Sequence, residues 1–251
     1  MFRSSNPALK EEIFKVEARL VQDTQPMTIQ GTINKTFVLL VLVAISSAWI
    51  WSLVSQGQLG IAYPMMIAGA VVGLISGIVV LFKKTWVGLL APVYAVAQGL
   101  FIGGMSSMLE QRFPGIAIQA VGLTFGTLFC LLGAYKTGWI RASDKFRAGL
   151  VSAMGGIMML YFVSWIARLF GVSMSFMTGS GIFSIGLSVI VVAVAALNLV
   201  MDFDAIERGV KENAPKYMEW FGAFGLMVTL IWLYVEILIL LSKLADRRNN
   251  A

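Results

Sequence analysis

The chain alternates between long apolar runs and short polar segments. Seven of the apolar runs hold about 20 residues, the helical length that crosses a hydrocarbon core of ~30 Å. This pattern predicts an all-α membrane protein built as a bundle of seven transmembrane helices. The predicted spans are Thr36–Val54, Ile61–Phe82, Trp86–Leu109, Ile116–Tyr135, Ala148–Ala167, Gly179–Met201 and Phe221–Ser242.

The spans leave no room for a separate soluble domain. The polar stretch before them carries apolar residues from Leu9 to Leu20 at a spacing of four, three and four, which forms one stripe on a helix. An amphipathic helix at the cytoplasmic membrane surface and a solvated helical tail both fit this stripe. The predicted organisation is an amphipathic segment over residues 1–30, a membrane domain over 31–245 and a polar tail over 246–251.

The distribution of basic residues excludes nucleic acid as a partner and predicts an orientation. The net charge is +6, but charged residues make up only 13% of the chain, against about 25% in soluble domains. Fourteen of the nineteen Lys and Arg residues lie in alternate polar segments, beginning with the N-terminal one. This positive-inside pattern places the N-terminus in the cytoplasm and, with seven spans, the C-terminus outside.

Glycines recur at intervals of four in two of the predicted spans. Such ridges allow helix backbones to approach each other closely, and helix packing is a better interpretation of them than a pore lining. We give the pair Gly155–Gly156 the same interpretation. The residues of the two ridges are Gly69, Gly73, Gly77, Gly99 and Gly103.

Two acidic residues stand out against this apolar background. Glu236 lies inside the last span, and Asp202 ends the one before it. A carboxylate in mid-membrane costs about 2.5–3.5 kcal/mol on insertion scales, so each is a candidate functional residue. The chain has no histidine. Catalytic sites of the Ser-His-Asp or Cys-His kind and His-ligated metal sites are therefore excluded, and proton sensing near neutral pH would fall to a carboxylate.

The two acids extend polar stripes along their helices. Helical spacing places Ser184, Ser188, Asn198 and Asp202 on one face, and Gly222, Gly225, Thr229 and Glu236 on one face of the last span, with Glu219 on the same face. Polar stripes in membrane helices turn toward the bundle interior. Asp204 and Glu207, which precede a possible cap at Gly209, either support this site or form the polar edge of the membrane. The supporting residues are Ser188, Asn198, Asp204, Glu219 and Thr229.

Three sequence segments carry a family resemblance. They are VGLLAPVYAVAQGLFIGG in the third span, LNLVMDFDAIERG at the end of the sixth, and LIWLYVEILILLSKL in the seventh. With seven spans, the chain resembles the bacterial branch of the Bax inhibitor-1 family, also called the transmembrane Bax inhibitor motif family. The resemblance implies a central last helix, a bacterial inner-membrane location and a pH-sensitive calcium leak. It also implies that Asp202 and Glu236 share a proton and form a possible Ca²⁺ site, with calcium as the transported ion and no cofactor.

The chain departs from the family pattern at three points. Phe82 occupies the place of an arginine that joins the acidic pair, and Lys83 is the nearest cation. Glu236 replaces an aspartate. The spacing also separates Glu236 from Asp202 unless residues 212–221 lie along the membrane surface and the last helix starts near Gly222. Otherwise Glu219 becomes the partner of Asp202.

Two other functions remain open. Some family members are thought to bind membrane proteases or cell-death proteins, so the chain could be a regulatory protein with a membrane protease or another membrane protein as partner. An intramembrane aspartyl protease would also need two acids on neighbouring helices. Here the second acid is a glutamate, and no GxGD-like turn is present. We therefore expect a protein that is not an enzyme.

Overall fold

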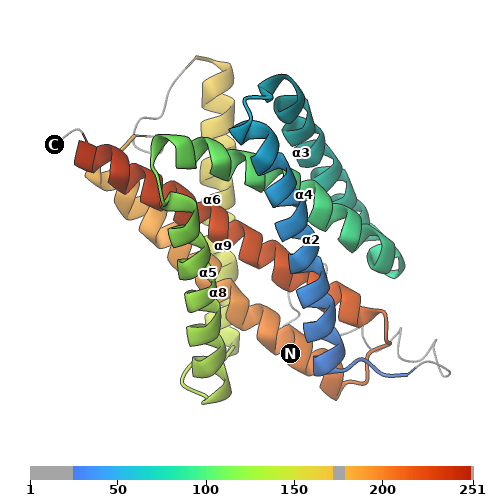
Figure 1. Ribbon diagram of the computed structural model, residues 1–251. Coiled ribbons are helices and arrows are strands. Elements are labelled where there is room, and N and C mark those ends of the chain that lie inside the picture. The colour runs from blue at the N-terminus through green and yellow to red at the C-terminus, as the bar shows by residue number, and fades with distance from the viewer. Residues whose placement is uncertain (1–24, 172–178, 250–251) are drawn as a thin grey trace. The chain divides into compact units, whose positions relative to one another are not determined.

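The computed structural model describes residues 25–171 and 179–249 (Figure 1). The predicted amphipathic helix between Leu9 and Leu20 lies outside these residues. Seven described helices are long and apolar enough to span a membrane, which confirms the predicted all-α bundle and makes this a multi-pass membrane protein. The elements are α2 (Ile29–Ser55), α3 (Leu59–Phe82), η1 (Lys84–Trp86), α4 (Val87–Arg112), α5 (Ile116–Lys136), α6 (Asp144–Leu169), α8 (Ile182–Lys211) and α9 (Met218–Asn249).

Most of the helices extend beyond the apolar runs, and at the starts of α2 and α6 a capping side chain accounts for the extension. In α6, the backbone N–H of Phe146 donates to the Ser143 hydroxyl at 3.3 Å, so the helix begins at Asp144 rather than at the first apolar residue. Helix α9 reaches Asn249 and includes most of the predicted polar tail. Among the described helices, α9 also has the largest buried share, as expected for a central last helix.

Two predicted helix ends are wrong. Helix α9 starts at Met218, not near Gly222, because hydrogen bonds from Met218 to Pro215 and from Glu219 to Lys216 close its first turn. Helix α8 passes through Gly209 and ends at Lys211. The left-handed residue after it is Asn213, with φ of 52°, a conformation that asparagine tolerates better than most residues.

The chain divides into two compact units. Unit 1 contains the described residues up to Met108 together with Asp202–Val228. Unit 2 contains the described residues of Leu109–Met201 and those from Thr229 onward. Asp202 therefore belongs to unit 1 and Glu236 to unit 2.

Close helix packing in unit 1 explains the glycine ridges. A Cβ placed on Gly99 of α4 would lie 2.5 Å from the Val43 carbonyl oxygen of α2, and one on Gly69 of α3 would lie 2.5 Å from the Ala97 carbonyl oxygen of α4. Only glycine allows these approaches, which confirms helix packing as the role of both positions. The same prediction is wrong for Gly155–Gly156, because within the described residues no atom of another element lies within 4 Å of a Cβ placed on either glycine.

The segment before α2 is joined to the connection between α8 and α9. The Met27 N–H donates to the Ala214 carbonyl oxygen at 2.8 Å, and Pro26 forms an isolated bridge with Pro215. The Met27 side chain is buried against Ala214 and Met218. These contacts fix the start of α2 beside the first turn of α9 within unit 1.

Candidate functional site

Glu236 is buried in unit 2 and is held by neutral hydrogen-bond donors. Its side chain is 5% exposed. The Tyr161 hydroxyl of α6 donates to Oε1 at 3.0 Å, and the Trp232 indole N–H, one turn earlier on α9, donates to the same oxygen at 3.1 Å. An indole N–H can only donate, so the carboxylate acts as an acceptor in this arrangement. The carboxylate is thus buried, while its donors are an exposed tyrosine and a half-buried tryptophan.

Lys243 brings a cation to the same helix. It lies two turns after Glu236 on α9 and is close enough to interact with it electrostatically. Its ammonium group donates to the Ser188 hydroxyl of α8 at 2.8 Å and to the Ser184 carbonyl oxygen at 3.4 Å. A partly buried lysine of α9 therefore points at the predicted polar stripe of α8.

The predicted polar stripes of α8 and α9 face each other within unit 2. The Asn198 amide donates to the Thr229 hydroxyl at 3.0 Å, and Ser188 meets Lys243 further along the same pair of helices. Ser188 and Thr229 are both buried. The polar side chains of the two helices thus form two separate hydrogen-bonded pairs in unit 2, each with one buried member.

Glu219 is fully buried in unit 1, where it is bound by charged groups. Its carboxylate accepts hydrogen bonds from the Thr28 N–H and the Thr28 hydroxyl, both at 2.9 Å. It also forms ion pairs with Lys216, at 2.8 Å, and with Lys35. Thr28 is the N-cap of α2, so this cluster attaches the start of α2 to the first turn of α9.

The acids at the end of α8 have different surroundings. Asp202 is half-buried in unit 1. Asp204 pairs with Arg208 at 2.8 Å and Glu207 pairs with Lys211 at 2.7 Å, each one turn along the helix. These two ion pairs favour the interpretation that Asp204 and Glu207 form the polar edge of the membrane. The pairing of Asp202 with Glu236 or with Glu219 stays a prediction, and no group of three or more acidic, Cys or His side chains among the described residues could hold a metal.

The sequence reasoning missed the donors around both buried glutamates. Trp232 and Lys243 carried a usable signal, because they lie four residues before and seven residues after Glu236 on one helical face. Tyr161 and Lys35 carried none, because they come from helices distant in the sequence. Only the fold brings them to Glu236 and Glu219.

Comparison with known proteins agrees with the family resemblance. The family model described as Bax inhibitor 1 like matches residues 6–246, nearly the whole chain. No curated protein and no solved structure matches the chain. Because the match covers nearly the whole chain, including both polar stripes and all but the last three residues of the seven described helices, the chain belongs to the Bax inhibitor 1 like family.

Proposed function

We propose that this protein is a pH-sensitive calcium leak channel of the cell membrane, gated by Asp202 and Glu236. The observation that carries the proposal is the buried carboxylate of Glu236 inside a membrane-spanning helix, with Tyr161 and Trp232 donating to it. Ionisable residues inside membrane spans are costly and commonly mark ion pathways or proton relays. Family membership supports the same assignment.

The chemistry of the carboxylate suits both calcium and protons. Calcium takes oxygen ligands, and carboxylates are the strongest of these in proteins. A protonated carboxyl group loses its negative charge and becomes a hydrogen-bond donor. Protonation of Glu236 would therefore remove the negative charge that attracts a calcium ion. It would also weaken the hydrogen bonds that Tyr161 and Trp232 donate to the carboxylate.

The polar groups beside Glu236 supply the rest of a gate. Asn198, Thr229 and Ser188 supply amide and hydroxyl oxygens along α8 and α9. Lys243 is the nearby positive charge, and Tyr161 is the other titratable group facing Glu236. A cation that moves along these oxygens would be repelled by Lys243 and attracted by ionised Glu236, so the balance would change with pH.

A flux measurement in liposomes tests the proposal. Purified full-length protein is reconstituted into liposomes that contain a calcium indicator, and calcium entry is measured from about pH 6 to pH 8. This range lies around neutrality, where a chain without histidine would have to sense protons with carboxylates. We expect flux that exceeds that of empty liposomes and changes with pH, and we expect Glu236→Gln to remove most of that change. Glu207→Gln is the control, because the ion pair of Glu207 with Lys211 is exposed to solvent and lies on α8 in unit 1, not in unit 2 with Glu236.

Two outcomes would count against the channel. Flux equal to that of empty liposomes would exclude conduction, and flux that does not vary with pH would exclude the carboxylate gate. Either result would favour a regulatory protein that binds a membrane protease or another membrane protein.

In the proposed orientation the N-terminus is cytoplasmic and the C-terminus is outside.

A further inference from the structure

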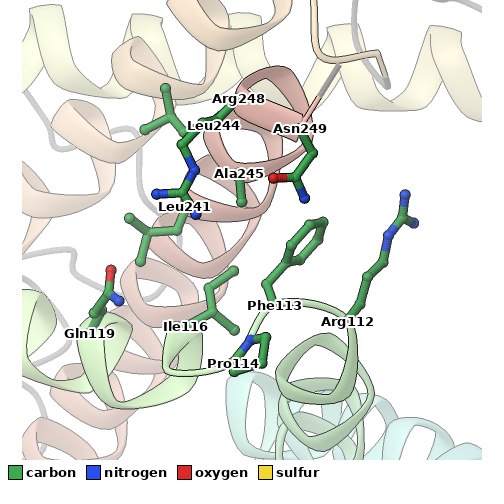
Figure 2. Close-up of a pocket in the computed structure, with 10 residues that line it drawn as sticks. All are labelled: Arg112, Phe113, Pro114, Ile116, Gln119, Leu241, Leu244, Ala245, Arg248 and Asn249. Atoms are coloured by element: carbon green, nitrogen blue, oxygen red, sulfur yellow. The ribbon is translucent and has the colours of Figure 1, made fainter. Parts of the chain in front are cut away.

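A pocket of about 480 Å³ lies in unit 2 where three membrane-spanning helices end. It is formed by the last turn of α4, the turn into α5 and the last turns of α9. Figure 2 shows apolar side chains gathered at its centre, with Arg112 and Arg248 on either side of them in this view. The lining residues are Arg112, Phe113, Pro114, Ile116, Gln119, Leu241, Leu244, Ala245, Arg248 and Asn249.

Fixed backbone geometry shapes the pocket. The Glu110 carboxylate accepts hydrogen bonds from the Gly115 N–H at 2.6 Å and from the Ala117 N–H at 2.9 Å. Gly115 has a φ of 87°, a left-handed conformation that strains other residues. The turn that carries Phe113 and Pro114 is therefore held by its own capping interactions, and the pocket does not need a ligand to form.

The lining combines positive charge with apolar surface and contains no acid. Arg112 contacts Asp246 through Nη2 at 2.8 Å, and its side chain is still 67% exposed, so other guanidinium donors remain at the surface. Arg248 is exposed on the last turn of α9 and forms no ion pair with the described residues. Two guanidinium groups beside apolar side chains match a ligand that has a phosphate at one end and hydrocarbon at the other.

We propose that this pocket binds the headgroup of an anionic phospholipid. Its position favours a lipid over a soluble anion. Three helices long and apolar enough to span a membrane have an end here, and the two guanidinium groups are placed to pair with a lipid phosphate at those ends. Leu241 and Leu244 precede Arg248 on α9 and so lie nearer the middle of the helix, where they can contact the acyl chains. The proposal is independent of ion conduction.

Lipid binding to the full-length protein tests the proposal. The detergent-solubilised chain is titrated with dioleoylphosphatidylglycerol or dioleoylphosphatidylcholine, and bound lipids are counted by native mass spectrometry. We expect phosphatidylglycerol to bind more tightly, and each of Arg112→Gln and Arg248→Gln to weaken it about fivefold, the effect of one basic residue near a lipid surface. Arg248→Lys should retain most of the binding because it keeps the charge.

The neighbouring Arg247 provides a matched control, because it has the same charge on the same helical turn but does not line the pocket. Arg247→Gln should leave phosphatidylglycerol binding unchanged. An equal loss in Arg247→Gln and Arg248→Gln would overturn the proposal in favour of diffuse surface charge, and equal binding of the two lipids would also overturn it. Displacement of the lipid by inorganic phosphate at the same concentration would show a site for free anions. Arg248 is exposed, so its variant reports on binding even if Arg112→Gln disturbs the fold.

Discussion

The two buried glutamates differ in the groups that compensate them. Glu219 has two lysines and the cap of α2 within reach, so its charge is neutralised where it is buried. Glu236 accepts hydrogen bonds from a hydroxyl and an indole N–H, and the Lys243 ammonium acts on it electrostatically while donating to Ser188 and Ser184. A buried carboxylate that is paired with cations can join two helices as a structural contact. A buried carboxylate whose hydrogen-bond donors are neutral is better placed to exchange a proton. This contrast favours Glu236 as the functional acid and Glu219 as a structural one.

The coupling between the acids is testable residue by residue. If Asp202 and Glu236 share a proton, Asp202→Asn and Glu236→Gln should each remove most of the pH dependence of calcium flux. The double variant should then differ little from either single variant, because residues that act as a unit are not additive. The measurement is a double-mutant cycle on flux in liposomes.

A second cycle provides the contrast. Glu219→Gln combined with Asp202→Asn should give additive effects, because Glu219 is already bound by Lys35, Lys216 and Thr28. Strong coupling of Asp202 to Glu219, with none to Glu236, would mean that Glu219 is the second acid of the gate.

At this scale the sequence identified the acids but not their partners. A charge inside an apolar run is visible by inspection, and so is a polar stripe at helical spacing, which is why Glu236, Ser188, Asn198 and Thr229 could be selected. The partner of a buried carboxylate depends on which helix packs beside it. Tyr161 is 75 positions away from Glu236 in the chain, and no local pattern connects them.

At the scale of elements, apolar length predicted each of the seven described helices and misplaced most of their ends, although the end of α3 at Phe82 and the start of α5 at Ile116 are confirmed. The ends depend on capping groups and on short turns, as at Ser143 for α6 and Pro215 for α9, and these act outside the apolar run. Glycine spacing likewise predicted close packing for both ridges and failed at Gly155–Gly156. A glycine reports close approach only if a neighbouring helix uses that face, which the sequence of one helix cannot show.

The packing of α4 against α2 gives a prediction with an internal control. A Cβ at Gly103 would lie 2.5 Å from the Ser47 Cα, a backbone atom that cannot rotate away. We expect Gly103→Ala to destabilise the protein by about 1–3 kcal/mol, as overpacking does. Thermal unfolding in detergent, followed by helical circular dichroism, measures the effect.

The control is Gly155→Ala on α6, where no described atom of another element lies within 4 Å of the added Cβ. Alanine favours a helix interior over glycine, so this variant should be unchanged or up to ~1 kcal/mol more stable. Equal destabilisation by both variants would mean that the loss at Gly103 comes from the helix itself and not from its contact with α2.

At the scale of the whole molecule, seven helices and the family assignment agree, and the orientation is the main feature still to be measured. An odd number of spans places the two ends of the chain on opposite sides. The basic residues decide which end is inside. The segments assigned to the outer side hold only Arg112, Arg168, Lys243, Arg247 and Arg248 of the nineteen basic residues, and this bias favours a cytoplasmic N-terminus.

Reporter fusions at residue 1 and residue 251 would measure this orientation directly. A cytoplasmic reporter, active only inside the cell, should work at the N-terminus and fail at the C-terminus, and a reporter active only outside should show the reverse. The physical reason is that basic segments next to short apolar helices are retained on the cytoplasmic side during insertion. If both ends were found on one side, one of the seven helices would have to enter and leave by the same face. If that helix were α8 or α9, its polar stripe would not cross the membrane. An ion path along Glu236 would then be excluded.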